Sequence, residues 1–112
     1  LMKKNNVAIH SFNCPEWFFA AMGSLYAHKY FCGIYNTNRG QQCMHVINTG
    51  SCDVLVVENQ EILLDNYAEV LDDLKDITIV VINHDNYEID TSLSHLDIHL
   101  FLIFIAPIFT VF

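Results

Sequence analysis

Hydrophobic residues along this chain form short continuous runs that alternate with segments of helical periodicity. The runs are rich in β-branched and aromatic residues, which favour strands, and they cover residues 7–12, 31–35, 53–57 and 77–82. Between the runs, apolar residues recur at helical spacing in residues 15–28, 41–48 and 60–75. Strands that alternate with helices of this length form right-handed βαβ units. The pattern therefore predicts an α/β fold in which βαβ units form a parallel sheet.

The first predicted helix has an unusual start and apolar residues on nearly every side. Pro15 fits the first helical position, where its missing N–H costs no hydrogen bond. Cys14 caps a helix poorly, so Asn13 or the Glu16 carboxylate is expected to compensate. Because apolar residues surround this helix, we expect it to be buried on most sides. Trp17 is predicted to lie buried against the sheet, and Trp17→Ala to cost ~3–5 kcal/mol of stability.

The second and third predicted helices carry signals at their ends and on their faces. Thr37 or Asn38 is the predicted cap of the second helix, and Gly50 its C-terminal stop. The third helix has one apolar stripe and one acidic face, which we interpret as solvated rather than as a binding surface. The stripe consists of Leu63, Tyr67, Val70, Leu71 and Leu74, and the acidic face of Glu61, Asp65, Glu69, Asp72 and Asp73.

Composition places the chain among ordered single domains and narrows its partners. The chain has 112 residues, of which 53% are hydrophobic and 16% charged, so extensive burial is expected. The net charge is −8, from 13 acidic and 5 basic residues. Because the basic residues are scattered, no stripe exists that would neutralise the phosphates of a nucleic acid. We therefore exclude a nucleic-acid partner.

The four cysteines, Cys14, Cys32, Cys43 and Cys52, contain no CxxC pair. This spacing fits neither a zinc ribbon nor a small disulfide scaffold. It predicts reduced, buried thiols and a cytoplasmic protein. The chain starts with Leu1 before Met2 and shows no basic-then-apolar leader, which we interpret as an entry into the reading frame, or the fold, part-way.

Candidates for catalysis or ligand binding are few. The four glycines are too dispersed for a phosphate-binding loop. His95 and His99 lie four residues apart with Asp97 between them, which would place two imidazoles on one helical face. A metal site would need a further ligand from His84 or a cysteine, so we favour reading them as polar residues beside an apolar tail. We interpret the aromatic residues 17–19 as core. The residues themselves thus predict no catalytic, cofactor-binding or metal site.

Three pieces of the sequence resemble the N-terminal part of adenylate-forming enzymes. They are VAIHSFNCPEWFFAAMGSLYA, GIYNTN and CDVLVVENQEIL, and together they are similar to bubblegum-type long-chain acyl-CoA synthetases. The resemblance identifies residues 1–82 as a partial AMP-binding domain, followed by a non-matching apolar tail in residues 83–112. The residues that carry it are Asn13, Pro15, Glu16, Trp17, Gly33, Ile34, Tyr35, Thr37, Val57 and Gln60.

The resemblance implies a role in fatty acid activation and lipid metabolism. Such enzymes use ATP and magnesium to convert a long-chain fatty acid to an acyl-adenylate and then transfer the acyl group to coenzyme A. Their Ser/Thr/Gly-rich phosphate loop and their other catalytic motifs have no counterpart in this sequence. The resemblance therefore assigns no catalytic, cofactor-binding or metal residue here, and it implies that this segment is scaffold and that the chain alone is inactive.

The sequence departs from the family pattern at two places inside the match. His28 and Lys29 stand where the family tends to have glycine, which predicts the loss of a left-handed helix stop worth about 1 kcal/mol. Arg39 and Gly40 replace a Ser-Pro type of helix start, which predicts a weakening of the second helix of similar size.

The C-terminal segment leaves other functions open. Residues 100–112 (Leu100 to Phe112) carry no charge, and they are the candidate segment for membrane association. As a helix they would extend about 20 Å, short of the ~30 Å hydrocarbon core, and an extension back to Ser92 would include Asp97. We favour a tail that packs on the sheet or is exposed. The alternatives to an enzyme fragment are a non-catalytic remnant that binds a partner through a sheet edge, a small membrane-anchored protein, and a metal or redox module.

Overall fold

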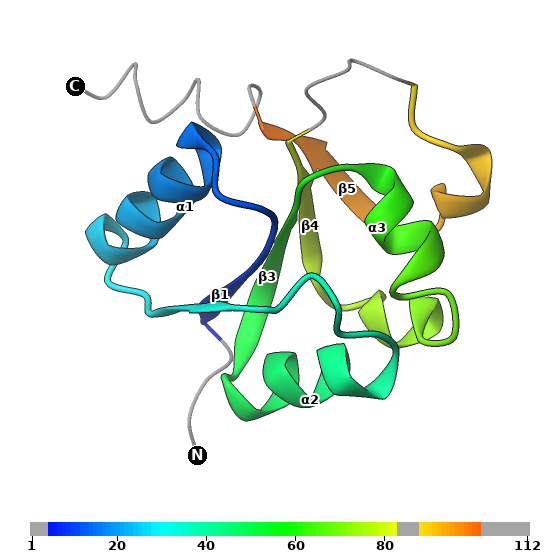
Figure 1. Cartoon of the computed structure of the whole chain (residues 1–112), viewed down its shortest axis with the longest axis horizontal. Helices are drawn as coiled ribbons and strands as arrows, with labels where there is room; N and C mark the ends of the chain where they lie inside the picture. Colours follow the sequence, from blue (N-terminus) through cyan, green and yellow to red (C-terminus); the bar gives the residue numbers. More distant parts are fainter. Residues whose placement is uncertain (1–4, 83–87, 102–112) are drawn as a thin grey trace.

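The protein folds around one five-stranded parallel sheet in a computed structural model that describes residues 5–82 and 88–101 (Figure 1). The strand order across the sheet is β2-β1-β3-β4-β5. Every neighbouring pair runs parallel, including the first two strands of the chain, so the predicted parallel βαβ architecture is confirmed. The strands are β1 (Asn6–His10), β2 (Phe31–Gly33), β3 (Cys52–Val57), β4 (Thr78–Val81) and β5 (Asp97–Leu100).

Strand β1 lies between β2 and β3 and is covered on both of its faces. Ala8 pairs with Cys32 in β2 and with Leu55 in β3. Ala8 and Ile9 have no solvent exposure. A parallel strand in this position has no polar face, which is why the three central residues of β1, Val7, Ala8 and Ile9, are all apolar.

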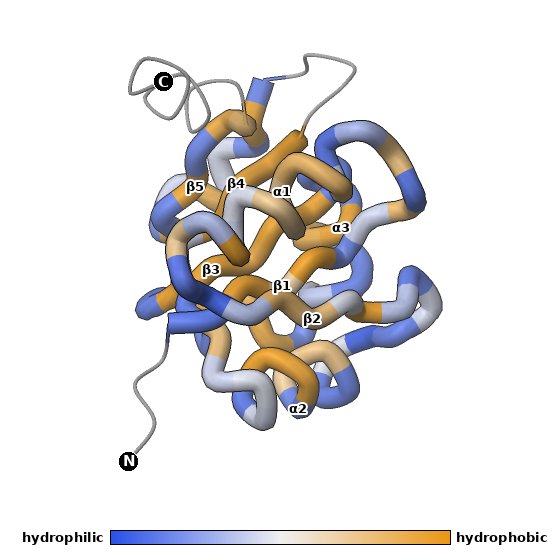
Figure 2. The backbone as a smooth tube through the Cα atoms, turned by 90° about the vertical axis from the view of Figure 1, so that its left-hand side faces the viewer, coloured by the Kyte–Doolittle hydropathy of each residue, from blue (hydrophilic) through white to orange (hydrophobic). Residues whose placement is uncertain are grey.

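The two faces of the sheet pack against different helices. Side chains alternate between the faces along each strand. Leu55 and Ile79 lie in the apolar cluster formed with α2 (Gln41–Thr49) and α3 (Gln60–Asp65). Val56 and Val80 lie in a smaller cluster formed with α1 (Pro15–Tyr26) on the other side. Figure 1 shows the sheet between α1 and the other helices, and Figure 2 shows the hydrophobic backbone of β1, β3 and β4 in the middle of the molecule.

Helix α1 ends in a turn whose left-handed position is held by histidine. His28 has a φ of 61°. The N–H of Lys29 donates to the carbonyl of Ser24 at 2.8 Å, and the N–H of His28 donates to the carbonyl of Leu25 at 3.0 Å. These two bonds define a Schellman stop. The prediction that the stop is lost without glycine was therefore wrong, because the stop forms with a residue for which this backbone conformation costs about 1 kcal/mol.

The outer sides of α1 are more exposed than its composition predicts. Only Ala21 and Ser24 are buried in this helix, whereas Phe18 and Phe19 are 59% and 50% exposed. The expected burial on most sides was wrong. A helix that lies on a sheet buries one stripe, and no second element covers the outer sides of α1 among the described residues.

Trp17 is half-buried at the edge of the sheet instead of being enclosed. Its ring meets the ring of Phe31 edge-on, with 5.7 Å between the ring centroids. The predicted full burial was therefore wrong, although the side chain does pack against the apolar cluster between α1 and the sheet. The loss expected for Trp17→Ala falls to about half of the value for a buried tryptophan, roughly 2 kcal/mol.

Helix α2 starts without a side-chain cap and ends close to the predicted boundary. Gly40 precedes the helix with φ 51° and ψ −120°, a conformation that favours glycine. Neither Thr37 nor Asn38 caps the helix, so the predicted cap was wrong. Gly50 is the C-terminal cap as predicted, and a Cβ there would lie 3.2 Å from each of two cysteine sulfurs.

The third predicted helix is shorter than its pattern indicates. Helix α3 ends at Asp65, and the chain continues through turns into a short 3₁₀ helix, η1 (Leu71–Leu74), so the predicted continuous helix over residues 60–75 was wrong. The apolar stripe nevertheless faces the core. Of its residues, Leu71 is half-buried, and the fully enclosed ones are Leu63, Tyr67, Val70 and Leu74.

The helix breaks at Asn66 because this residue bonds to a distant loop. The N–H of Gly40 donates to the Asn66 carbonyl at 2.7 Å. In a continuing helix that carbonyl would accept from Val70, whose N–H donates instead to the Tyr67 carbonyl at 2.9 Å. The amide nitrogen of Asn66 also donates to two backbone carbonyls of the loop after β2, those of residues 36 and 38, at 3.0 and 2.9 Å.

Strand β5 lies in the segment that the sequence suggested to be tail. Its Ile98 pairs with Ile79 of β4, and a 3₁₀ turn, η2 (Thr91–Leu93), precedes it. The disfavoured alternative of a helix extended back to Ser92 does not form, because β5 occupies Asp97–Leu100, while residues 102–112 lie outside the described residues. No helix in the described ranges is long and apolar enough to cross a membrane. The domain boundary at residue 82 stays a prediction.

The left-handed histidine at the end of α1 gives a stability prediction. We expect His28→Gly to raise the free energy of unfolding by about 1 kcal/mol, because glycine takes a positive φ without the Cβ penalty. Urea titration of the two proteins measures the difference. His28→Ala is the control, since it removes the imidazole and keeps the Cβ. An alanine variant as stable as the glycine variant would show that the backbone at this position is not strained.

Candidate functional site

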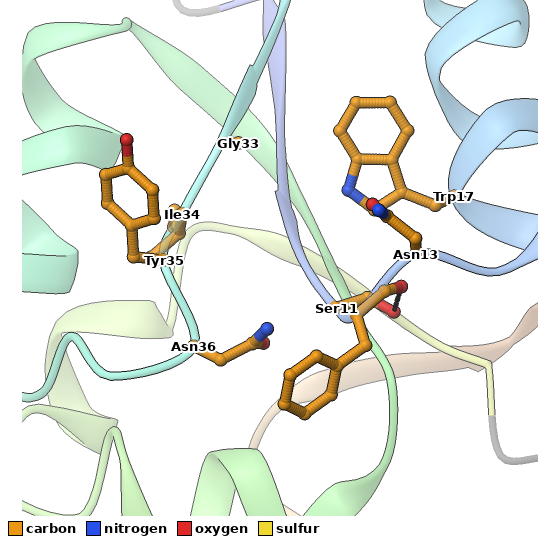
Figure 3. A pocket seen from close by; sticks show the side chains of 8 residues that line it. Ser11, Asn13, Trp17, Gly33, Ile34, Tyr35 and Asn36 are labelled. Atoms are coloured by element: carbon orange, nitrogen blue, oxygen red, sulfur yellow. Dashed lines mark hydrogen bonds between the residues drawn. The ribbon is translucent and has the colours of Figure 1, made fainter.

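A hollow of about 420 Å³ opens at the carboxyl ends of β1 and β2 (Figure 3). In open parallel sheets the carboxyl ends of the strands are where ligands bind. Residues that follow each of the two strands line it, together with one side chain of α1. These residues are Ser11, Phe12, Asn13, Trp17, Gly33, Ile34, Tyr35 and Asn36.

The hollow offers hydrogen-bonding groups but no charge. The Ser11 hydroxyl donates to the Phe12 carbonyl at 2.9 Å. The side-chain oxygen of Asn36 is buried and accepts no hydrogen bond within the described part of the chain. Figure 3 shows Trp17 and Asn36 on opposite sides of the space. Because none of the lining residues is charged, the hollow has nothing to neutralise a phosphate or a carboxylate.

A buried histidine–tyrosine pair links the end of β1 to the segment after α3. His10 has no solvent exposure, and its Nδ1 lies 2.9 Å from the Tyr67 hydroxyl. Burial lowers the pKa of His10 to about 4, opposed only in part by the backbone of Asn36. Burial also raises the pKa of the Tyr67 hydroxyl, with a smaller contribution from the neighbouring Cys43 thiol. Both groups are thus neutral at pH 7 and out of reach of a substrate, so the pair is structural.

Two cysteines meet beside Gly50 without a catalytic partner. The sulfurs of Cys32 and Cys52 lie 3.5 Å apart. The hydrogen bond between them lowers the pKa of Cys32 and raises that of Cys52. All four cysteines are free, but only Cys43 and Cys52 are buried while Cys14 and Cys32 are half-buried, so the prediction of four buried thiols was half wrong. None of the four cysteines is among the residues that line the hollow.

The histidines that the sequence suggested as metal ligands do not come together. His95 lies in the turn after η2, 4.0 Å from an oxygen of Asp72. His99 is in β5, with its Nε2 2.8 Å from Asp97. The two are therefore not on one helical face, and His84 lies outside the described residues. Across residues 5–82 and 88–101, no group of three or more potential ligands is placed to hold a metal ion.

The acidic face of the third predicted helix is exposed, as expected of a solvated surface. All five of its carboxylates are exposed, and they lie partly on α3, partly on η1 and partly on the turn between them. The aromatic residues 17–19 are neither core nor an enclosed ligand pocket, since only Trp17 is half-buried.

Sequence reasoning missed the pair of His10 and Tyr67, although signals for it were present. A histidine ends a run that is apolar enough for a strand covered on both faces, and a buried histidine needs a partner. Tyr67 belongs to the apolar stripe and carries a hydroxyl with the same need. What the sequence did not contain was the break after α3 that turns Tyr67 toward β1.

Comparisons with known proteins give the fold its family. No protein-family model matches the chain. The chain is 35% identical over 82 residues to the long-chain-fatty-acid–CoA ligase ACSBG1 of rat, which covers 73% of this chain and 11% of that protein. It is 41% identical over 59 residues to the ligase heimdall of Drosophila melanogaster, a match that covers 53% of this chain and 9% of that protein. It is 42% identical over 59 residues to the ligase ACSBG2 of chicken, a match that covers 53% of this chain and 8% of that protein.

The fold agrees with these matches. A parallel sheet with helices on both faces is compatible with the first part of the large N-terminal domain of adenylate-forming enzymes. The matched part of this chain belongs to the long-chain-fatty-acid–CoA ligases of the bubblegum type. The chain spans about 11% of the length of the rat relative that it matches.

The depressed pKa of His10 predicts how stability depends on pH. In the unfolded chain His10 takes up a proton with the ordinary pKa of 6.5, while in the folded protein it does so only near pH 4. The unfolded state therefore binds more protons between these values, so the free energy of unfolding falls as the pH drops from 6.5 to 4. The contribution of this one group is roughly 3 kcal/mol.

Urea unfolding at pH 7 and pH 4.5 measures this effect in matched variants. His10→Gln should lose most of the pH dependence, although it is also less stable at pH 7. His45→Gln, which replaces an exposed histidine, should keep it. Equal pH dependence in the parent protein and in His10→Gln would mean that the pKa of His10 is not lowered in the folded protein.

Proposed function

We propose that this chain supplies part of the scaffold of a long-chain fatty acid–CoA ligase, an enzyme of lipid metabolism. The complete enzyme would activate a long-chain fatty acid with ATP and magnesium and transfer the acyl group to coenzyme A. The observation that carries this proposal is the match of 82 residues at 35% identity to a ligase of this class. The parallel sheet supports it, because strands and helices are what the family places in this segment. A cytoplasmic location belongs to the same proposal.

The residues of this chain do not fit the ATP phosphates or magnesium. Adenylation requires donors and a cation that hold the phosphates while the carboxylate attacks. The four glycines are dispersed over residues 23–50. Lys29, the basic residue nearest to the end of α1, is bonded to Asp53 at 3.2 Å. We therefore propose that the 112-residue chain is inactive by itself.

A second candidate function, a non-catalytic interaction module, is favoured by the exposed aromatic residues around β2. Within the described part of the sheet, β2 is an edge strand, and such edges can pair with another chain. Tyr30 and Tyr35 on either side of it are 77% and 81% exposed. In the scaffold proposal, the same surface is where further parts of the enzyme pack. A membrane anchor formed by residues 100–112 falls mostly outside the described residues and stays a prediction.

Fatty-acid-dependent ATP–pyrophosphate exchange tests the proposal in two arms. Purified residues 1–112, supplied with magnesium and a long-chain fatty acid, should give no exchange above a boiled control. A rat ligase in which the aligned segment is replaced by the matched residues of this chain should retain exchange, because the replacement preserves the sheet.

A control chimera makes the second arm specific. Ala8 is fully buried in the central strand, so a chimera with Ala8→Asp buries an unpaired charge and should be inactive. Exchange by the isolated chain that scales with protein would reveal a phosphate site outside the described geometry. An inactive but correctly folded chimera would reject the scaffold role and favour the interaction module.

A further inference from the structure

Two cysteine thiols from different strands meet on the face of the sheet that α2 and α3 cover. The sulfurs of Cys32 in β2 and Cys52 in β3 lie 3.5 Å apart. Cys52 has no solvent exposure, and Cys32 packs against the apolar cluster to which Cys52 belongs. Neither cysteine lines the hollow at the ends of β1 and β2. The function proposed above therefore gives this thiol pair no role.

The strand order disfavours a disulfide between these two cysteines. Strand β1 lies between β2 and β3, so the two backbones are separated by two strand spacings, about 9.6 Å in all. The Cα atoms of a disulfide lie only about 4.4–6.8 Å apart. The two side chains thus extend toward each other over β1, where the small side chain of Ala8 leaves room. A single atom held between the two sulfurs would bridge this wider gap.

The space beside the two sulfurs depends on Gly50. The backbone of Gly50 is right-handed helical, with φ −79° and ψ −2°, a conformation that residues other than glycine also adopt. A Cβ on Gly50 would nevertheless lie 3.2 Å from each of the two sulfurs and 3.1 Å from the carbonyl oxygen of Val46. Glycine is therefore needed here for room rather than for its conformational freedom.

The two thiols differ in their readiness to lose a proton. The hydrogen bond with Cys52 lowers the pKa of the Cys32 thiol to about 7, although burial acts in the opposite direction. The same hydrogen bond, together with burial, raises the pKa of Cys52. Near neutral pH the pair therefore offers a Cys32 thiolate beside a Cys52 thiol. A thiolate is the form of cysteine that binds metal ions.

The number and the type of ligands restrict which ion could bind. Structural zinc takes four ligands, and calcium and magnesium take oxygen ligands. Across residues 5–82 and 88–101, no third potential ligand joins the pair to form a metal-binding group. Copper(I) is a soft ion that selects thiolates, and it accepts two sulfur ligands in a line. Cys32 is half-buried on an edge strand of the described sheet, which gives an ion a path to the pair.

We propose that Cys32 and Cys52 form a two-coordinate site for copper(I) that bridges β2 and β3 across β1. The Cys32 thiolate and the Cys52 sulfur bind the ion from opposite sides, and the Cys52 proton passes to water. With bonds of about 2.3 Å, as for zinc and thiolate, the sulfurs move apart to about 4.6 Å. The bound ion holds the short edge strand β2 in the sheet. This is a metal-binding activity separate from the activation of a fatty acid.

Anaerobic titration of the complete chain with copper(I), in competition with a copper(I) chelator, tests the proposal. The parent protein should bind one ion, and Cys32→Ser and Cys52→Ala should each weaken binding by about 100-fold or more, since even partners of a ligand are worth 10–100-fold. Cys14→Ser is the matched control, because it removes a half-buried thiol outside the pair, and it should bind as the parent does. Parent-like affinity in Cys32→Ser, or lost affinity in Cys14→Ser, would overturn the proposal.

X-ray absorption at the copper edge counts the ligands in the parent protein and depends on no variant. Two sulfur neighbours of copper are expected. A third sulfur neighbour, or a nitrogen neighbour, would overturn the two-coordinate site. Zinc(II) added in excess should leave the copper in place, and displacement of the copper by zinc would contradict a site with two ligands.

A variant that keeps both thiols provides a further measurement. Gly50→Ala places a methyl group beside the two sulfurs, so copper(I) affinity should fall by about tenfold or more, because a site tolerates displacements of only about 0.5 Å. Gly23→Ala is the matched control, since a Cβ there would meet no heavy atom within 4 Å, and it should bind as the parent does. Unchanged affinity in folded Gly50→Ala would place the ion elsewhere and overturn the proposal.

Discussion

The burial of β1 on both faces and along both edges is the constraint on which the rest of the structure depends. Its backbone N–H and carbonyl groups have no access to water there, so they must be paired by neighbouring strands. Strands β2 and β3 supply these bonds in parallel, and parallel neighbours require crossover segments. Helices α1 and α2 are those crossovers. The chain therefore commits its first 57 residues to enclosing one five-residue strand.

The polar contacts of the interior extend this enclosure to the carboxyl end of β1. His10 ends the strand and reaches Tyr67, which lies in position because the helix breaks one residue earlier at Asn66. Asn66 in turn bonds to the loop after β2 and to the start of α2. A few hydrogen bonds therefore tie together three segments that are far apart in the sequence. Each bond is worth only about 1 kcal/mol, but a buried group left without its partner costs more.

The sequence was informative where structure follows from local pattern and less so where it follows from distant contacts. The inner strands β1, β3 and β4 were predictable, because a strand enclosed in a parallel sheet is mostly apolar on both faces. The break of the third helix was not, because a bond between Gly40 and Asn66 decides it. The exposure of α1 was missed because apolar composition does not say whether another element arrives to cover a helix. Strand β5 was missed because Asp97 and His99 interrupt its apolar pattern, as an edge strand permits.

The candidate site, too, was predictable from the sequence only where it depends on local pattern. From the sequence we predicted no catalytic, cofactor-binding or metal residue, and the described residues bring together an uncharged hollow and a buried neutral pair. The hollow depends on how β1 and β2 end relative to α1, which no short motif encodes. What the sequence did provide was the family, through the residues around the first helix and the second strand. Packing accounts for Ile34, which is buried, and for Trp17, whose ring meets that of Phe31, whereas Tyr35 is exposed at the hollow.

Native-state hydrogen exchange tests most directly whether β1 is the centre of this fold. The amides of Val7, Ala8 and Ile9 should be among the slowest to exchange, together with those of β3, and they should exchange only through global unfolding. The amides of β2 and β5, which are edge strands in the described sheet, should exchange faster by local opening. Exchange of the β1 amides as fast as those of β2, under conditions where β3 stays protected, would contradict the account.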